Sequence, residues 1–309
     1  MDDSGIFLLN TRSRRIAAGT VIFLFVFAIG ITLYVHPYQL HDTTITAKSK
    51  TTDAFSSVSI VGKAAIVYDL TTDKILFSKN AHAQLPLASI TKLLTVYTAV
   101  KYLGIHARIP ITHADVAVDG DSGFDPGEVF ALEPLAGFTL AGSINDGAVA
   151  IARATASRVK KSIPELLSSV AQASGLTQIY ALNGSGLDSS ATVSGGYGSP
   201  YDVAILAGKL LNEAPGIASF TTKSTTTITS INGIVHTKQN TDPYVTDIAG
   251  IRLSKTGYTN LAGGNLVVVF DASFGHPVAI VVLGSTEKDR FTDVLKLIKA
   301  TRSYLANVQ

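Results

Sequence analysis

The segment LASITKLL, residues 87–94, places a serine and a lysine three positions apart at the start of an apolar run that continues to Leu103. Apolar positions recur in this run at spacings of three and four, which predicts a buried helix. Residues three apart share one face of a helix, so the amine of Lys92 is expected beside the hydroxyl of Ser89. A lysine whose pKa is lowered can take the proton of a serine and make it a nucleophile. This segment is therefore a candidate catalytic centre.

The spacing of serine and lysine is a weak signal alone, because it occurs twice more in the chain. Ser157 and Lys160 lie in an Arg/Lys-rich stretch typical of a solvated helix end. Ser285 and Lys288 lie where an apolar strand pattern gives way to a polar turn. Only the pair that starts with Ser89 opens a buried helix, so that pair is the candidate.

The composition of the 309-residue chain excludes several kinds of function. Its hydrophobic fraction of 46% is ample for a folded core. The formal net charge is +2 and the basic residues are scattered, so no nucleic-acid partner is expected. The chain has no cysteine, which excludes disulfides, a cysteine nucleophile and thiolate metal sites. No phosphate-binding loop and no metal-ligand spacing of histidines is found, so we expect no cofactor and no metal.

The N-terminal part has the pattern of a membrane anchor. Residues 1–15 end in clustered arginines, and residues 16–35 contain no charged side chain. A helix of this length spans about 30 Å, the thickness of a bilayer core. Because the arginines precede the apolar run, the positive-inside rule keeps residues 1–15 in the cytoplasm and places the rest of the chain outside. We therefore expect a single transmembrane segment.

A cleaved signal peptide and a buried core helix are the alternatives for this apolar run. The run is longer than the roughly 7–15 residues of a signal-peptide core, and no good small-x-small cleavage site follows it. Residues 36–57 are rich in Thr, Ser and Lys, which predicts a linker outside the membrane. The folded domain is then expected over residues 58–309.

Strand patterns lie at both ends of that domain, and helix patterns lie between them. Residues 63–70 and 75–78 predict a hairpin. An amphipathic helix is expected over residues 289–305, at the end of the chain. Three short strands are expected before it, over residues 251–256, 265–271 and 277–283. This order predicts an α/β domain whose sheet combines the N-terminal hairpin with the C-terminal strands, with an all-helical insertion between them.

Two further short motifs follow Ser89. Residues 143–145 read Ser-Ile-Asn, and residues 255–257 read Lys-Thr-Gly. Ser-x-Asn occurs at two other places, whereas Lys-Thr-Gly occurs once. The ordered set of Ser-x-x-Lys, Ser-x-Asn and Lys-Thr-Gly is specific, and such a set is found in penicillin-binding proteins and class A β-lactamases.

On these residues the chain resembles the serine-type D-alanyl-D-alanine carboxypeptidases, the low-molecular-weight penicillin-binding proteins. The resemblance covers the chain from roughly residue 60 to its end and implies the penicillin-binding/β-lactamase-like transpeptidase fold, with an antiparallel sheet flanked by helices. Beyond the three motifs, the similar pieces are residues 68–72, 76–77, 87–95, 126–128, 140–150, 174–177, 183–187, 200–202, 255–259 and 262–264.

The resemblance implies a serine D,D-carboxypeptidase that removes the terminal D-alanine from peptidoglycan stem pentapeptides. Ser89 would attack the carbonyl of the penultimate D-alanine and form an acyl-enzyme. Lys92 would take the serine proton. Ser143 would relay a proton to the departing D-alanine, and Asn145 would hydrogen-bond Lys92 and the substrate backbone.

The remaining motif is implied to bind the other end of the substrate. Lys255 and Thr256 would bind the terminal carboxylate. Gly257 would leave room for the substrate to lie against the strand as an added β-strand. The backbone N–H groups of Ser89 and Tyr258 would stabilise the oxyanion. The implied partners are stem peptides and, as covalent inhibitors, β-lactams, at the outer face of a bacterial cell membrane.

Three departures from the family pattern bear on these expectations. Ile144 stands where the family usually has a small residue, and residues 252–254 read Arg-Leu-Ser where it usually has Asp-Gly and an apolar residue. Both put pocket shape and catalytic rate in question. Many relatives continue into a C-terminal β-rich domain and an amphipathic anchor, whereas this sequence stops after the closing helix, so its N-terminal segment is expected to be the anchor.

Three rival functions share part of this pattern. A D,D-endopeptidase that cuts peptidoglycan cross-links would carry the same motifs. A class A β-lactamase would need a glutamate that activates the deacylating water, and Glu165 is the superficially similar residue. A catalytically inert, wall-binding module would not need the intact set of Ser, Lys, Ser, Asn and Lys.

Overall fold

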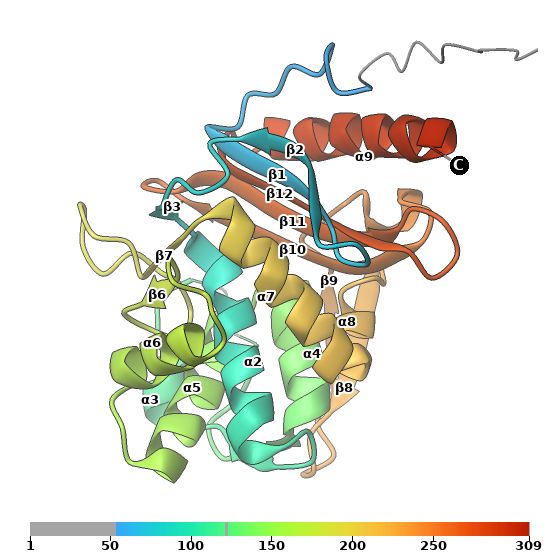
Figure 1. Ribbon diagram of the computed structural model, residues 1–309. Coiled ribbons are helices and arrows are strands. Elements are labelled where there is room, and N and C mark those ends of the chain that lie inside the picture. Colours follow the sequence, from blue (N-terminus) through green and yellow to red (C-terminus); the bar gives the residue numbers. More distant parts are fainter. Residues whose placement is uncertain (1–53, 121–122, 309) are drawn as a thin grey trace, which may run out of the picture. The chain divides into compact units, whose positions relative to one another are not determined.

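The computed structural model describes residues 54–120 and 123–308 of the chain (Figure 1). The predicted cytoplasmic N-terminus, the predicted transmembrane segment and most of the predicted linker lie outside these ranges. Within the ranges, no helix combines the length and the apolar character that crossing a bilayer requires.

A five-stranded antiparallel sheet joins the two ends of the described chain (Figure 1). Strand β1 lies between β12 and β2, so the first strand pairs with the last. In spatial order the strands are β10 (Ile251–Thr259), β11 (Gly263–Asp271), β12 (Pro277–Ser285), β1 (Ala64–Asp69) and β2 (Lys74–Lys79). The predicted sheet, which combines the N-terminal hairpin with the C-terminal strands, is confirmed.

Each face of this sheet has its own apolar core. Ala65 and Val67 of β1 pack with α9 (Asp289–Val308), whereas Ile66 and Tyr68 pack with the helices on the other face. This alternation follows from strand geometry, which points successive side chains to opposite faces. Each fully buried Val or Ile contributes about 1.5–3 kcal/mol, so both layers are held firmly to the sheet.

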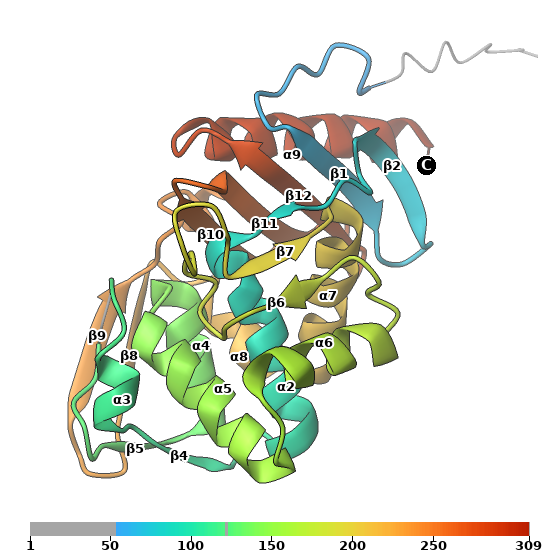
Figure 2. The same ribbon diagram turned by 90° about the vertical axis from the view of Figure 1, so that its left-hand side faces the viewer.

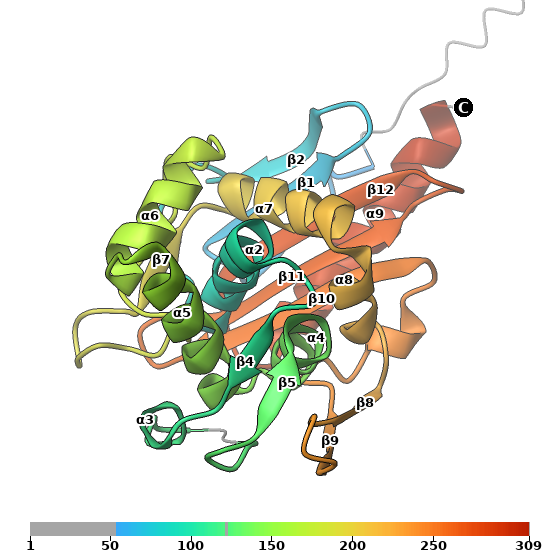
Figure 3. The ribbon, with the colours of Figure 1, turned by 90° about the horizontal axis from the view of Figure 1, so that it is seen from below.

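Helix α2 (Thr91–Leu103) is the central helix of the insertion, and other helices surround it (Figure 3). This position explains why its sequence is apolar on nearly every side. The helices around it are α4 (Leu132–Gly142), α5 (Asn145–Val159), α6 (Ile163–Ala173) and α7 (Pro200–Glu213). The shorter helical pieces are η1 (Ala88–Ile90), α3 (His113–Val116), α8 (Pro215–Phe220) and η2 (Val245–Asp247).

The insertion is not all-helical, which corrects the prediction. Its described part contains three small antiparallel sheets, and most of their strands are only two or three residues long, too short for a readable alternation. The strands are β3 (Leu85–Pro86), β7 (Gly196–Gly198) and β6 (Tyr180–Ala181) in one sheet, β4 (Arg108–Pro110) and β5 (Val129–Ala131) in the second, and β8 (Thr225–Thr229) and β9 (Val235–Gln239) in the third.

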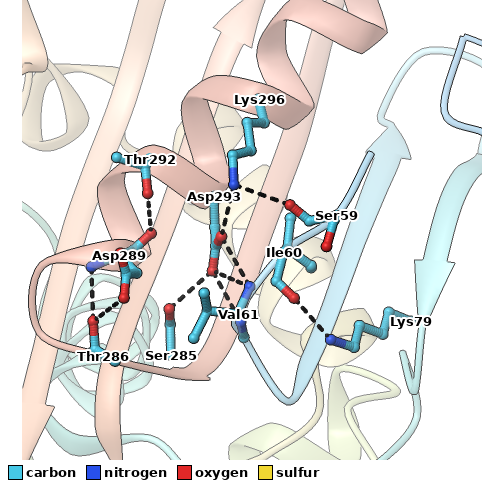
Figure 4. Close-up of polar contacts among 11 residues, drawn as sticks. Ser59, Ile60, Val61, Lys79, Ser285, Thr286, Asp289, Thr292, Asp293 and Lys296 are labelled. Atoms are coloured by element: carbon cyan, nitrogen blue, oxygen red, sulfur yellow. Dashed lines mark hydrogen bonds and ion pairs between the residues drawn. The ribbon is translucent and has the colours of Figure 1, made fainter. Parts of the chain in front are cut away.

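One buried carboxylate ties the segment before β1 to α9 and β12 (Figure 4). Asp293 is fully buried and accepts hydrogen bonds from the backbone N–H groups of Val61 (3.0 Å) and Gly62 (2.9 Å). The hydroxyl of Ser285 donates a further bond to it (2.9 Å). The three donors come from both ends of the domain, so this single side chain links the segment before β1 to the end of β12.

Phe55 belongs to the folded domain, although the prediction places it in the linker. Its ring is buried, with its centroid 5.7 Å from that of Phe77 and 5.9 Å from that of Tyr304. A single aromatic residue in a polar stretch gives no periodic signal, which explains why the predicted boundary at residue 58 is a few residues late.

Candidate active site

The predicted nucleophile lies in a tight turn at the start of α2. Ser89 is half-buried in η1, and the preceding residue, Ala88, has a left-handed φ of 48°. Such a conformation is costly for a residue with a side chain and is found where the surrounding structure enforces it. Gly186 packs closely against this turn, because a Cβ there would collide with the carbonyl oxygen of Ala88. A segment nearly a hundred residues later in the chain therefore contacts the turn directly.

Lys92 brings its amine to the serine, as predicted. Its Nζ lies 2.8 Å from Ser89 Oγ, 2.8 Å from Asn145 Oδ1 and 2.8 Å from the carbonyl oxygen of Ser185. The amide and carbonyl oxygens can only accept hydrogen bonds. In the neutral amine, the two N–H groups therefore point at these oxygens, and the lone pair faces the hydroxyl of Ser89. This is the arrangement that a general base requires.

Ser143 and Asn145 lie at the junction of two helices. Helix α4 ends at Gly142, the next residue, Ser143, has a φ of 58°, and α5 begins at Asn145. The amide of Asn145 donates to the carbonyl oxygen of Asp119 (3.1 Å), while its oxygen accepts from Lys92. The short break between the helices thus places the side chains of Ser143 and Asn145 where Lys255 and Lys92 can reach them.

Lys255 reaches the same point from strand β10. It is buried, and its Nζ donates to Ser143 Oγ (2.9 Å) and to the carbonyl oxygen of Thr256 (2.7 Å). Burial lowers the pKa of Lys255 well below its usual value, and the positive charge that the nearby Lys92 and Arg290 carry when protonated adds to this effect. The structure therefore places Lys255 behind Ser143, where its amine can supply or withdraw a proton through that hydroxyl.

Gly257 brings β10 against the nucleophile turn. A Cβ at this position would lie 2.8 Å from the carbonyl oxygen of Leu87 and 3.2 Å from the backbone nitrogen of Ile90. Glycine is thus required because the turn itself fills this space, a reason different from the predicted room for substrate. The next residue, Tyr258, has an exposed side chain.

Three contributors to the site were not predicted. The carbonyl oxygen of Ser185 has no side-chain signature, although the turn that holds it begins with Asn183, whose Oδ1 accepts from the backbone of Gly186 (2.7 Å). The hydroxyl of Thr241 lies 2.6 Å from that of Thr256. The third is the guanidinium of Arg290, on α9.

Arg290 holds the β10 backbone from behind. Its Nη1 donates to the carbonyl oxygen of Gly257 (2.8 Å), and burial lowers the pKa of the guanidinium. The arginine lies where the last strand pattern gives way to a polar turn and helix, a place that sequence alone indicates as solvated. It fixes the strand at the point where β10 meets the nucleophile turn.

The departures from the family pattern have local explanations. Ile144 is fully buried, and glycines at 123 and 142 make room for its branched side chain. Ser254 donates to Asp242 (2.6 Å), and Arg252 pairs with Asp271 (2.8 Å). None of these contacts is with Ser89 or Lys92. The residues that depart from the family pattern are therefore accommodated by their own neighbours.

The look-alike residues lie elsewhere. Ser157 and Lys160 are both exposed at the end of α5. The hydroxyl of Ser285 donates a hydrogen bond to Asp293, and Lys288 is exposed. Glu165 is exposed in the first turn of α6, where Lys161 pairs with it at 3.8 Å. It has no contact with the site, so the residue that a class A β-lactamase would need is not supplied by Glu165.

The structure thus gathers Ser89, Lys92, Ser143, Asn145 and Lys255 into one hydrogen-bonded group beside the edge strand of an antiparallel sheet. The sequence profile of the D-alanyl-D-alanine carboxypeptidase family matches residues 48–287, and the chain belongs to this family. The D-alanyl-D-alanine carboxypeptidase DacF of Bacillus subtilis is 27% identical over 250 residues, which are 79% of this chain and 62% of that protein. The chain thus matches less than two thirds of this relative's length.

Solved structures share the fold. The D-alanyl-D-alanine carboxypeptidase of Mycobacterium tuberculosis superposes with a TM-score of 0.70 at 22% identity, over 79% of this chain and 92% of that one. Penicillin-binding protein D2 of Listeria monocytogenes, in its ampicillin-bound form, gives a TM-score of 0.66 at 22% identity, over 78% of this chain and 98% of that one. These similarities confirm the predicted penicillin-binding-protein-like fold.

Proposed function

We propose that the chain is a serine D,D-carboxypeptidase that removes the terminal D-alanine from peptidoglycan stem pentapeptides. The observation that carries the proposal is the position of the Lys92 amine, 2.8 Å from Ser89 Oγ and bonded to two acceptor oxygens, which in the neutral amine would turn the lone pair toward the serine hydroxyl. Membership in the family and the activity named for DacF of B. subtilis support it.

The reaction begins with attack by Ser89 Oγ on the carbonyl carbon of the penultimate D-alanine. The serine proton passes to Lys92 Nζ, and the N–H groups of Ser89 and Tyr258 stabilise the oxyanion. The C–N bond then breaks, and the departing D-alanine takes a proton through Ser143, which Lys255 contacts. Water hydrolyses the resulting ester and regenerates the serine.

The terminal carboxylate of the substrate binds at the start of this reaction to the hydroxyl groups of Thr256 and Thr241. These groups lie 2.6 Å apart beside Lys255, so a carboxylate can replace the bond between them. Its negative charge would favour the protonated form of the Lys255 amine, offsetting the effect of burial on that pKa. Substrate binding therefore prepares the proton that the leaving group needs.

The proposal is tested with a pentapeptide that ends in D-Ala-D-Ala, by measuring released D-alanine, and with labelled penicillin, by measuring the covalent adduct. Ser89→Ala is expected to abolish both signals. Ser157→Ala, the serine of an exposed look-alike pair, is the matched control and should keep both. An adduct that persists in Ser89→Ala would overturn the assignment of the nucleophile.

The same preparation separates the rival activities. A D,D-endopeptidase would release monomers from defined cross-linked muropeptides faster than it releases D-alanine. A β-lactamase would turn over a chromogenic β-lactam rapidly, whereas we expect one slow acylation event per molecule. The ampicillin-bound relative from L. monocytogenes supports β-lactams as covalent inhibitors of this chain.

We also propose that residues 16–35 anchor the enzyme in the bacterial cell membrane with the catalytic domain outside. The support is the uncharged run preceded by clustered arginines. Protease added to intact spheroplasts should remove the catalytic domain while leaving a membrane-bound N-terminal fragment. A full-length chain that resists this treatment would contradict the orientation.

A further inference from the structure

One of the oxygens that orient the proposed base belongs to the backbone of a loop. Ser185 lies in the segment that connects β6 and β7, which passes the start of α2 (Figure 2). Ser185 is buried, and its carbonyl oxygen accepts a hydrogen bond from Lys92 Nζ at 2.8 Å. The direction in which the neutral amine points its lone pair therefore depends on where this loop holds one carbonyl group.

The side chain of Asn183 folds the loop into a turn around that carbonyl group. Its Oδ1 accepts from the backbone N–H of Gly186 (2.7 Å), and from both the backbone N–H (3.2 Å) and the hydroxyl (3.1 Å) of Ser185. Its Nδ2 donates to the carbonyl oxygen of Leu187 at 2.9 Å. Asparagine favours such turns because its short side chain can bond to the backbone a few residues further on. One side chain thus makes four hydrogen bonds within the turn.

The carbonyl oxygen of Ser185 and the N–H of Gly186 belong to the same peptide group. A trans peptide group is planar, so its C=O and its N–H point in opposite directions. Asn183 Oδ1 holds the N–H on one side of this plane, and Lys92 Nζ bonds to the C=O on the other. Hydrogen bonds in such a chain polarise one another, so the bond to Asn183 also makes the carbonyl a better acceptor. Asn183 therefore acts on the amine through one rigid group.

The turn packs tightly on α2, so a change in its shape would be passed on to the amine. The carbonyl oxygen of Gly184 accepts from Thr95 Oγ1 at 2.8 Å. Thr95 is three residues after Lys92 and shares its helix face. Gly186 has a left-handed φ of 79°, and a Cβ there would collide with the carbonyl oxygen of Ala88. The turn thus contacts the structure around the proposed nucleophile at several points.

We propose that Asn183 is a positioning residue for the proposed general base. It fixes the peptide group between Ser185 and Gly186. Through this group it sets the direction in which Lys92 presents its lone pair to Ser89. This inference rests on the proposed function, because it takes Lys92 as the group that accepts the serine proton.

The test follows adduct formation with benzylpenicillin by rapid quench, over concentrations up to saturation. The maximal first-order rate constant does not depend on the fraction of molecules that are folded, which changes only the amplitude. Asn183→Ala removes all four hydrogen bonds, and we expect this rate constant to fall by roughly 10-fold to 100-fold, because the base is misplaced. The concentration that gives half the maximal rate should stay close to that of the wild type.

Two milder variants ask whether the acceptor oxygen is the important group. Asn183→Asp keeps an oxygen that can accept from the N–H of Gly186, so its rate constant should lie nearer to the wild type than to Asn183→Ala. Asn183→Ser keeps a shorter acceptor and should fall between the two. Each variant is compared at the pH of its own maximal rate, so that a change in the proton affinity of Lys92 does not enter the comparison.

Asn80→Ala is the matched control. Asn80 is also an asparagine in a turn, with a left-handed φ of 50°, and its amide donates to the carbonyl oxygen of Lys63 at 2.9 Å. It is exposed at the end of β2, and its replacement should lower stability while keeping the wild-type rate constant.

The two levels of failure are distinguishable. A wild-type rate constant with a smaller amplitude in Asn183→Ala would show that the asparagine only stabilises the fold, and would overturn the inference while the proposed function stands. A change confined to the half-saturating concentration, or an Asn183→Asp variant as slow as Asn183→Ala, would also overturn it. If no folded Asn183→Ala can be prepared, a wild-type rate constant in Asn183→Ser has the same effect.

The wild-type protein tests the level below. If it formed no adduct with benzylpenicillin at Ser89, the proposed function would fail, and this inference with it.

Discussion

Lys255 is the residue at which stability and chemistry conflict most directly. The residue is 1% exposed, and burial lowers the pKa of its amine, so the charged form costs free energy in the folded state. A hydrophobic side chain of similar length would avoid this cost. The lysine is nevertheless placed against Ser143, where the proposed reaction needs a proton. Such conflicts are expected at functional sites.

Replacing Lys255 by methionine should separate the two effects. We expect the rate of acylation by penicillin to fall at least about 100-fold, because an electrostatic and proton-transfer partner is lost. The melting temperature at neutral pH should stay the same or rise. Lys299→Met removes an exposed amine on α9 and should match the wild type in acylation rate. A large fall in both stability and rate would show that Lys255 is chiefly structural.

The same residue predicts a pH dependence of stability. The folded-state pKa of Lys255 lies below its ordinary value of 10.5, so between these two values the unfolded chain binds more protons than the folded chain. The contribution of Lys255 to the free energy of unfolding therefore rises with pH across that window. Denaturant titrations of the wild type and Lys255→Met at several pH values should show this rise only in the wild type. A parallel pair of curves would contradict the lowered pKa.

The side chains of the candidate site were predictable from sequence, whereas the backbone groups that hold them in place were not. The three motifs carry side-chain chemistry at fixed spacing, and the structure brings Ser89, Lys92, Ser143, Asn145 and Lys255 together. The carbonyl oxygen of Ser185 has no sequence signature, because every residue has a carbonyl. Contacts of this kind depend on which loops meet in the fold, and no local pattern encodes that.

At the scale of elements, the close contact of β10 with the turn that contains Ser89 positions the proposed nucleophile. The two elements touch through backbone atoms, and only glycine at position 257 allows it. On the far side of the strand, Arg290 holds the same residue's carbonyl oxygen. The strand is therefore clamped between the turn and α9 at the point where the oxyanion is expected.

A single methyl group at this contact should impair the reaction. In Gly257→Ala the new Cβ would lie 2.8 Å from the carbonyl oxygen of Leu87, so the turn or the strand must shift. Displacements of about 1 Å can cost about 100-fold in rate, and we expect a loss of that order in penicillin acylation. Gly275→Ala, in the turn before β12, is the control. Its φ is positive, at 66°, unlike that of Gly257, but no described atom lies within 4 Å of the added Cβ.

The control variant should lose roughly 1–2 kcal/mol of stability from its left-handed backbone and keep the wild-type acylation rate. Circular dichroism melts and labelling kinetics on the same samples provide both quantities. Wild-type kinetics in Gly257→Ala would show that the approach of β10 to the turn is not required for acylation.

Long periodic elements were predictable, and short ones were not. The nucleophile helix, the closing helix and the strands of the main sheet carry enough repeats to read, and the structure confirms them. Strands such as Arg108–Pro110 and Gly196–Gly198 are three residues long and exist because a partner strand lies beside them. Tertiary pairing defines these elements, so local sequence cannot.

At the scale of the whole molecule, Asp293 joins the start of the domain to its end. Three donors, from Val61, Gly62 and Ser285, would lose their acceptor in Asp293→Ala. Each buried donor left unsatisfied costs about 1–3 kcal/mol, so we expect a loss of about 3 kcal/mol or more. For a domain of this size, that lowers the melting temperature by about 6–12 °C. Lys299→Ala, exposed on the same helix, should change it by less than about 2 °C.

The pairing of β1 with β12 affects how the protein folds. Ala64 lies opposite Leu283, so the centre of the sheet cannot form until the last strand has been synthesised. Contacts between such distant residues slow folding. Lys255 also arrives late, on β10, whereas Ser89 and Lys92 are made early. The proposed site needs Lys255 beside Ser89 and Lys92, so we expect reactivity toward penicillin to appear only at the final step of refolding. The rate at which the protein becomes able to form the adduct would then measure the rate at which the native sheet is completed.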